Sequence, residues 1–220
     1  MKANRQKSDR PQGKSTLARW WYSLCWVVCW AFCKVLFRFH YSGRGNVPMS
    51  GPMLVVSNHQ SHLDPVLIGV ACPRQVGALA RASLFVGPFG WLIRSFGAVP
   101  VERGSAAGGI KALLGMLRAG EAAIVFPEGT RTTDGALQTF QTGFCAIARR
   151  GGATIVPTTI DGAFTALPRG AKFPRPRPIT LRFNEPITSD DYAQLTDEQL
   201  LALTVARIAS EYPVPCTSAC

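Results

Sequence analysis

A chain of 220 residues has room for one ordinary α/β domain with a substantial core, and two full domains are not expected. Hydrophobic residues make up 47% of the sequence and charged residues only 17%, which excludes a disordered or coiled-coil protein. The 24 Lys and Arg against 13 Asp and Glu give a formal net charge of +11. The protein is therefore expected to be globular and strongly basic.

The basic residues are concentrated at the N-terminus. Residues 1–44 hold nine of them and a single acid, Asp9, so this segment carries +8 of the net +11. A basic segment beside an apolar stretch predicts contact with anionic membrane lipids. Nucleic acid is not expected as a partner, because most of the tryptophans lie inside the apolar stretch instead of alternating with arginines.

The apolar stretch predicts a membrane-associated helical segment over 16–41, after a disordered basic tail over 1–15. Residues 20–33 would form about 21 Å of helix, which is short against the roughly 30 Å of a bilayer's hydrocarbon core. Extension of the helix to 17–39 reaches about 35 Å but includes three basic residues. Their side chains would have to extend along the helix so that the charged ends stay in water. A helix in or on one leaflet is favoured, and a membrane-spanning helix is the alternative. A secretory signal is less favoured, because no small-residue cleavage site closely follows.

Residues 42–213 are expected to form the main domain, and 214–220 a C-terminal tail. Short apolar runs near turn residues predict buried strands at 53–57, 76–80, 98–101, 122–126, 154–157 and 179–183. Helices are expected at 65–71, 84–94, 105–119, 143–150 and 196–211. Ser105 is an expected N-cap, and Thr196 with Gln199 an expected capping box. Residues 168–178, PRGAKFPRPRP, predict a surface loop. This alternation predicts an α/β fold whose central sheet, mostly parallel or mixed, is flanked by helices.

The cysteines do not suggest a metal site. There are seven, with neither a C-x-x-C pair nor a Cys/His spacing typical of metal ligands. Cys25, Cys29 and Cys33 are four residues apart and would share one helix face. We expect them to be small packing residues in a reducing compartment.

The segment SNHQSHLD, residues 57–64, follows the first predicted strand of the domain. His59 would leave the end of a strand, a usual place for active-site groups, and Asp64 could fold back to orient its imidazole. This predicts a general base, although an isolated match of this kind is more often a polar loop without a catalytic role. No G-x-S-x-G motif supplies a nucleophilic serine, so the substrate's own hydroxyl is the expected nucleophile. His40 and His62 lack such a partner and are expected to be structural or on the surface.

Two further segments that follow predicted strands each contain an arginine. Residues 126–131 read FPEGTR and residues 99–104 read VPVERG. Glycine allows close approach of the backbone, and the planar guanidinium of Arg131 or Arg103 suits a phosphate. Each arginine alone would more often be a surface salt-bridge residue, but two beside a candidate base predict a phosphate site.

Together these segments resemble the lysophospholipid and glycerolipid acyltransferases. Asn58-His59 through Asp64, then 101–103 (VER), 126–131 (FPEGTR) and 155–157 (IVP), look like the four ordered blocks of that family. Bacterial 1-acyl-sn-glycerol-3-phosphate acyltransferases are the nearest type. The resemblance covers about residues 20–190, so it implies that 42–213 is an acyltransferase domain.

The resemblance implies roles for single positions. His59 and Asp64 match the catalytic dyad, in which the histidine deprotonates the acceptor hydroxyl. The acceptor-binding positions are Arg103, Glu128, Gly129, Thr130 and Arg131, and Arg81 matches a position where relatives carry a cation. The resemblance implies no chemical role for residues 155–157. The implied reaction moves a fatty acyl group from acyl-CoA or acyl carrier protein to a lysophospholipid, with 1-acyl-sn-glycerol 3-phosphate as the favoured acceptor and phosphatidic acid as the product. No metal or bound cofactor is implied, and the expected location is the cytoplasmic face of the inner or plasma membrane.

The sequence departs from the family at two positions. Gln141 stands in FQTG where relatives often have lysine, and Ser83 stands where they tend to have glutamate. A missing positive charge near the acceptor keeps other acceptors open, such as glycerol 3-phosphate or a lyso-aminolipid. A non-enzymatic lipid-binding protein is the alternative from another class, and the paired His59 and Asp64 speak against it.

Overall fold

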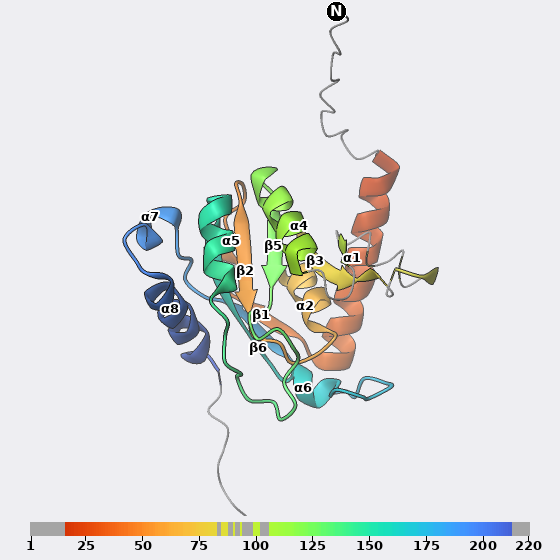
Figure 1. The fold of residues 1–220 in the computed structure, drawn as a ribbon. Coiled ribbons are helices and arrows are strands. Elements are labelled where there is room, and N and C mark those ends of the chain that lie inside the picture. Colours follow the sequence, from red (N-terminus) through yellow and green to blue (C-terminus); the bar gives the residue numbers. More distant parts are fainter. Residues whose placement is uncertain are drawn as a thin grey trace, which may run out of the picture.

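The computed structural model describes residues 16–82, 85–87, 90, 93, 99–101 and 106–212. In these residues a central sheet carries helices on both of its faces, and a long helix, α1, lies along one side (Figure 1). This is the α/β architecture that the alternation of apolar runs predicts.

The sheet has seven strands within the described residues, in the order β1-β7-β6-β2-β5-β3-β4. All neighbouring pairs are parallel except β6 and β7, so the sheet is mixed but mostly parallel. All five residues of β2 are buried, as expected for a central strand covered on both faces. The strands are His40–Ser42 (β1), Met53–Ser57 (β2), Val76–Arg81 (β3), Val99–Val101 (β4), Ala122–Val125 (β5), Thr154–Asp161 (β6) and Thr180–Phe183 (β7).

The helices divide between two hydrophobic cores, one on each face of the sheet. Alternate residues of β2 point to opposite cores: Val55 packs with the core under α1 and α2, and Leu54 with the core under α4, α5 and α8. The helices are Thr16–Phe37 (α1), Asp64–Ala71 (α2), Ala106–Arg118 (α4), Gly143–Gly151 (α5), Ala163–Ala166 (α6), Ser189–Tyr192 (α7) and Asp197–Ala209 (α8), with a short 3₁₀ turn at Arg44–Asn46.

Most of the predicted elements are confirmed to within a few residues. The capping box of α8 is present, with Thr196 and Gln199 bonded reciprocally. β6 continues to Asp161, four residues beyond the predicted end, because its last residues pair with β7. Three elements were not predicted from the sequence, and each has only three or four residues: β1, α6 and α7. The expected N-cap Ser105 and most of the expected helix 84–94 lie outside the described residues.

Helix α1 has one apolar face on the domain and another open to solvent. Cys25, Cys33 and Phe37 are buried against the domain. Trp20, Leu24, Val27, Val28, Phe32 and Val35 are exposed hydrophobic residues of the same helix. All five cysteines in the described part of the chain are free. None of the helices in the described residues combines the length and apolarity needed to cross a membrane.

The end of α1 is part of the domain's core. The side chains of Phe37 and Phe39 are fully buried in the cluster that also contains residues of α2 and β7. The backbone N–H of Ile179 donates to the carbonyl of Phe37 at 3.0 Å, and that of His40 donates to the carbonyl of Ile179 at 3.0 Å. The helix and the sheet are therefore joined by packing and by backbone hydrogen bonds.

This packing predicts a strong position dependence of stability along the last turns of α1. Phe37→Ala should lower the free energy of unfolding by about 3–5 kcal/mol, because it leaves a cavity in the core. Val35→Ala is the matched control, since Val35 is 84% exposed, and should stay within about 0.5 kcal/mol. Urea unfolding followed by circular dichroism measures both. Equal losses would show that Phe37 does not anchor the helix.

Candidate active site

The site lies at the edge of the sheet where its parallel strands end. β2 and β5 are parallel neighbours, so the loop after Ser57 and the loop after Val125 leave the sheet at the same edge. The first loop carries His59, and the second carries Glu128 through Arg131. Residues from two segments that the resemblance connects are thus brought together by strand pairing.

His59 and Asp64 form a hydrogen-bonded pair. The imidazole Nδ1 lies 2.8 Å from Oδ2 of Asp64, whose side chain is fully buried at the start of α2. The same oxygen accepts the backbone N–H groups of Gln60 at 2.6 Å and Ser61 at 2.8 Å. Because this oxygen serves as an acceptor for all three groups, Nδ1 carries the hydrogen and Nε2 presents a lone pair.

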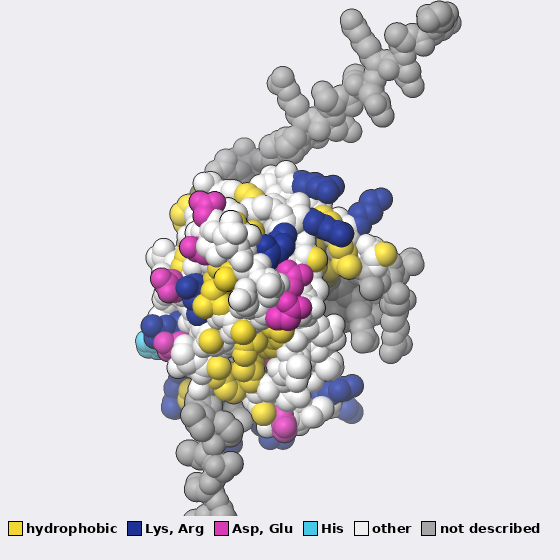
Figure 2. Space-filling model, turned by 60° about the vertical axis from the view of Figure 1, so that its left-hand side comes forward, with side chains coloured by type: hydrophobic (Ala, Val, Ile, Leu, Met, Phe, Trp, Pro, Cys, Tyr) yellow, Lys and Arg dark blue, Asp and Glu magenta, His cyan; other side chains and the backbone are white. Residues whose placement is uncertain are grey.

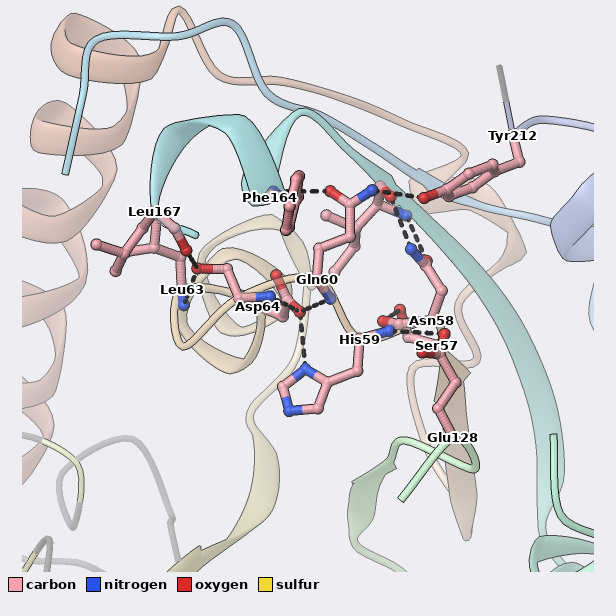
Figure 3. A network of polar contacts seen from close by, with 12 residues as sticks. Ser57, Asn58, His59, Gln60, Leu63, Asp64, Glu128, Phe164, Leu167 and Tyr212 are labelled. Carbon is pink, nitrogen blue, oxygen red and sulfur yellow. Dashed lines mark hydrogen bonds and ion pairs between the residues drawn. The ribbon is translucent and has the colours of Figure 1, made fainter. Parts of the chain in front are cut away.

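The imidazole ring is held on a second side by an aromatic contact. It stacks on the ring of Phe126, with ring centroids 4.0 Å apart and planes 16° apart. The His59 side chain is 19% exposed, and Figure 3 shows Nε2 on the side of the ring away from Asp64. The contacts therefore fix the ring from two sides, with Nε2 directed away from Asp64.

The loop after β5 holds the backbone of His59. Oε1 of Glu128 accepts the His59 N–H at 3.1 Å, and the N–H of Thr132 donates to the His59 carbonyl at 2.8 Å. Glu128 is only 7% exposed. The resemblance implies an acceptor-binding role for Glu128; in the structure its side chain is buried and accepts a hydrogen bond from the His59 loop.

Two amide side chains tie the His59 loop to β6 and α6. Asn58 donates through Nδ2 to the carbonyl of Ile160 and accepts its N–H through Oδ1, both at 2.8 Å. Gln60 accepts the N–H of Phe164 at 3.1 Å and donates to the hydroxyl of Tyr212 at 2.7 Å (Figure 3). These bonds surround the loop with fixed partners from distant parts of the chain.

Tyr212 connects both loops of the site. Its hydroxyl accepts from Gln60 and donates to the carbonyl of Gly135, in the segment that follows Arg131. Tyr212 was not predicted as a site residue, and it lies 152 residues from Gln60 in the sequence. No motif marks it, so only the folded chain reveals this contact.

The structure describes some of the remaining candidate residues fully, one in its backbone only, and one not at all. Gly129 has φ +69°, a conformation that suits glycine, and its neighbour Thr130 is exposed. Arg131 is half-buried in the same loop. Arg81 is the last residue of β3, at the same edge of the sheet, and its side chain is outside the description. Arg103 lies outside the described residues.

Gln141, the departure from the family pattern, lies beside this loop. Its backbone N–H donates to the carbonyl of Pro127 at 3.0 Å. A Cβ added to Gly129 would lie 3.4 Å from Nε2 of the Gln141 side chain.

The two other histidines are both exposed. His62 lies in the His59 loop, and His40 lies on β1, the outermost strand on one side of the sheet. Among the described residues, no group of three His, Cys, Asp or Glu is arranged to hold a metal ion.

The buried carboxyl of Glu128 predicts a pH-dependent stability. Burial raises its pKa from 4.5 to about 7; the His59 N–H opposes this shift, and the charge of Asp64 adds to it. Since the folded pKa exceeds the unfolded one, the stabilisation is present below the unfolded pKa and is lost as the pH rises through about 7. Between about pH 5 and pH 8, the free energy of unfolding of the wild type should therefore fall by up to roughly 3 kcal/mol relative to that of Glu128→Gln.

Urea unfolding at both pH values tests this prediction. The Glu128→Gln substitution is not expected to perturb the fold, since an amide oxygen can still accept the His59 N–H. Glu198→Gln removes an exposed carboxylate of α8 and is the matched control. Parallel pH profiles for wild type and Glu128→Gln would contradict the burial of a titrating carboxyl.

Comparisons with known proteins agree on one family. The family model described as Acyltransferase matches residues 38–161, more than half of the chain. Among curated relatives, a chloroplastic 1-acyl-sn-glycerol-3-phosphate acyltransferase of Arabidopsis thaliana is 31% identical over 65% of this chain and 42% of its own length. The Bacillus subtilis protein of that name is 28% identical over 80% of this chain and 91% of its own length. A lyso-ornithine lipid O-acyltransferase of Pseudomonas aeruginosa is 31% identical over 67% of this chain and 54% of its own length.

A solved structure has the same fold. The crystal structure of the 1-acyl-sn-glycerophosphate (LPA) acyltransferase PlsC from Thermotoga maritima aligns with a TM-score of 0.75 and 23% identity, covering 90% of this chain and 82% of that one. The chain spans about two fifths to half the length of the plant relatives it matches. With the family model covering strands β1 to β6 and both loops of the site, the chain belongs to the Acyltransferase family.

Proposed function

We propose that the protein transfers a fatty acyl group from acyl-CoA or acyl carrier protein to the free hydroxyl of a lysophospholipid. The observation that carries this proposal is the pairing of His59 with the buried Asp64 through Nδ1, which directs Nε2 of the partly exposed imidazole away from the carboxylate. A neutral imidazole held in one tautomer is suited to remove a proton from a hydroxyl. Membership of the Acyltransferase family supports the reaction class.

In the proposed reaction the acceptor hydroxyl donates a hydrogen bond to Nε2 of His59. As its oxygen attacks the thioester carbonyl carbon, the proton passes to Nε2 and the carboxylate of Asp64 stabilises the imidazolium. The new C–O bond forms, the C–S bond breaks, and the leaving thiolate takes the proton from His59. The thioester supplies the activated acyl group, so the proposal needs no metal or bound cofactor.

The favoured acceptor is 1-acyl-sn-glycerol 3-phosphate, which would give phosphatidic acid. The names of the Arabidopsis and Bacillus relatives support this choice. Arg131 lies on the loop beside His59, and a guanidinium there can pair with a phosphate monoester. Arg103 and Arg81 stay predicted contributors to this anion site.

A different acceptor is the second candidate, and Gln141 is the observation that favours it. This uncharged side chain lies beside Gly129, where relatives often supply a lysine. The Pseudomonas relative is named for a lyso-ornithine lipid acceptor, which shows that the sequence similarity extends to enzymes named for other head groups.

We also propose that α1 binds one leaflet of the cytoplasmic membrane from its cytoplasmic side. Leu24, Val28 and Phe32 are exposed and spaced by four residues, so they form a stripe on the solvent side of the helix. A helix with one apolar face against the protein and another facing outward suits an interfacial position.

The first test concerns the base. His59→Ala should lower kcat by roughly 10²- to 10⁴-fold, the usual contribution of a positioned general base, and Asp64→Asn should also be severe because it disturbs the tautomer. His62→Ala is the matched control, since His62 is an exposed histidine of the same loop. Release of free thiol from acyl-CoA, with lysophosphatidic acid as acceptor, measures turnover. Near wild-type turnover in a folded His59→Ala protein would rule out this mechanism.

The second test concerns the acceptor. Arg131→Ala should lower kcat/KM for lysophosphatidic acid by roughly 10- to 100-fold, with partial rescue by Arg131→Lys, while the KM for acyl-CoA changes much less. Arg150→Ala, an exposed arginine at the end of α5, is the control. If the true acceptor lacks a phosphate monoester, Gln141→Lys should shift preference toward lysophosphatidic acid. Equal losses for donor and acceptor in Arg131→Ala would assign Arg131 to the fold.

The third test concerns α1. Replacing Leu24, Val28 and Phe32 together by serine should weaken co-sedimentation with phospholipid vesicles by roughly 10- to 100-fold, because these side chains supply apolar burial. Substitution is preferable to deletion, since deletion of 1–41 would also remove Phe37 and Phe39 from the core. Ile110→Ser, at an exposed position of α4, is the control. Unchanged sedimentation of the triple variant would contradict the assignment.

A further inference from the structure

The loop over 168–178 carries an unusual combination of charge and exposed aromatic surface. Its four cations, Arg169, Lys172, Arg175 and Arg177, are exposed, and the sequence has no acidic residue between Asp161 and Glu185. None of the four forms an ion pair with a carboxylate in the described part of the chain. Among them, the side chain of Phe173 is 79% exposed.

Both ends of this loop are fixed to parts of the molecule with proposed functions. At its start, the carbonyl of Leu167 accepts the hydroxyl of Ser61, in the His59 loop, at 3.0 Å. At its end, Ile179 donates its N–H to the carbonyl of Phe37, the last residue of α1. Figure 1 shows the loop extending from α6 beside the lower end of α1. The loop therefore lies between the candidate active site and α1.

The loop is also restrained along its length. The N–H of Arg175 donates to the carbonyl of Ala166 at 2.7 Å, and the N–H of Ala171 to that of Pro168 at 3.1 Å. At the base, a Cβ on Gly162 would lie 2.1 Å from the carbonyl oxygen of Pro178, so these backbones are in close contact. Its four prolines further restrict the backbone. A restrained loop loses little entropy when it binds a surface.

Three arginines elsewhere on the protein have different surroundings. Arg149, Arg182 and Arg207 each pair with a carboxylate at 2.9–3.2 Å. On the face that Figure 2 shows, where α7 and α8 lie, acidic and basic side chains stand close to one another. The four cations of the loop, in contrast, form no such pair within the part of the chain that the structure describes.

We propose that residues 168–178 form a docking loop for an anionic phospholipid surface, in which Phe173 enters the interfacial region while the four cations contact headgroup phosphates. Phenylalanine is among the apolar side chains that enter the boundary between headgroups and acyl chains, and cations near an anionic leaflet are attracted to its headgroups. An acidic protein would satisfy the charge, but the exposed Phe173 and the nearby apolar face of α1 favour lipid. The inference rests on the proposed function in that docking would turn the His59 loop toward a bilayer that holds the acceptor.

Vesicle co-sedimentation of the full chain tests the charge component. The variant Arg169→Gln/Lys172→Gln/Arg177→Gln should bind vesicles of phosphatidylcholine with phosphatidylglycerol roughly 10- to 100-fold more weakly, and vesicles of phosphatidylcholine alone unchanged. Lys111→Gln/Arg118→Gln/Arg150→Gln, on α4 and α5, removes the same charges from other exposed positions. This control should stay within about twofold, since screening limits charge effects to about 8–10 Å.

A second variant tests the aromatic contact. Phe173→Ser should weaken binding to both kinds of vesicle by roughly fivefold, because the loss is apolar and does not depend on lipid charge. Met49→Ser, at an exposed apolar position remote from the loop in sequence, should leave binding unchanged. Equal binding of wild type and both loop variants to anionic vesicles would overturn the proposal.

Activity separates docking from the other possible roles of the loop. With a short-chain acceptor dispersed in solution, the loop variants should turn over like wild type, and with a long-chain acceptor in vesicles they should slow in proportion to binding. Loss of turnover on the dispersed acceptor would place the loop in the catalytic machinery and overturn the proposal. A raised KM for acyl carrier protein with unchanged vesicle binding would assign the loop to an acidic protein. If wild type itself showed no acyl transfer, the proposed function would fail while the vesicle data still decided the docking role.

Discussion

The buried carboxylate of Asp64 organises the candidate site. One of its oxygens accepts three N–H groups, from the ring of His59 and from the backbones of Gln60 and Ser61. These bonds curl the loop around the carboxylate and orient the imidazole, and the carboxylate itself is held at the first residue of α2. Since α2 packs on the core beneath α1, the direction of Nε2 is determined by the packing of the whole domain.

The loop around Asp64 is also held from outside, by groups that come from much of the chain. Glu128 and Thr132 bind the two polar groups of the His59 backbone, and Asn58 pairs with Ile160 in β6. Burying these polar groups would be costly if they lacked partners, so each bond disfavours a displaced loop. A displacement of the loop would have to break bonds to several separate parts of the fold.

The sequence predicted well what depends on neighbouring residues. β2 was predicted from a continuous apolar run, the capping box of α8 from local spacing, and the His59–Asp64 pair from five residues of separation. It could not show contacts that depend on the folded chain. Nothing near Tyr212 indicates that its hydroxyl reaches Gln60, and FPEGTR alone does not show that Glu128 turns inward to the His59 backbone. β1 was missed because three residues carry too little pattern and depend on pairing with β7.

The burial of Phe37 has a geometric consequence for the molecule. An anchor that is joined to a domain by a flexible linker lets the domain tumble above its support. Here the last turn of α1 lies in the same core as the sheet, and its carbonyl is bonded to Ile179. The angle between α1 and the strands is therefore set by the fold. If a surface binds the exposed face of α1, His59 would therefore lie at a fixed distance from that surface and in a fixed orientation. The fold would thus determine the depth at which His59 meets a hydroxyl group.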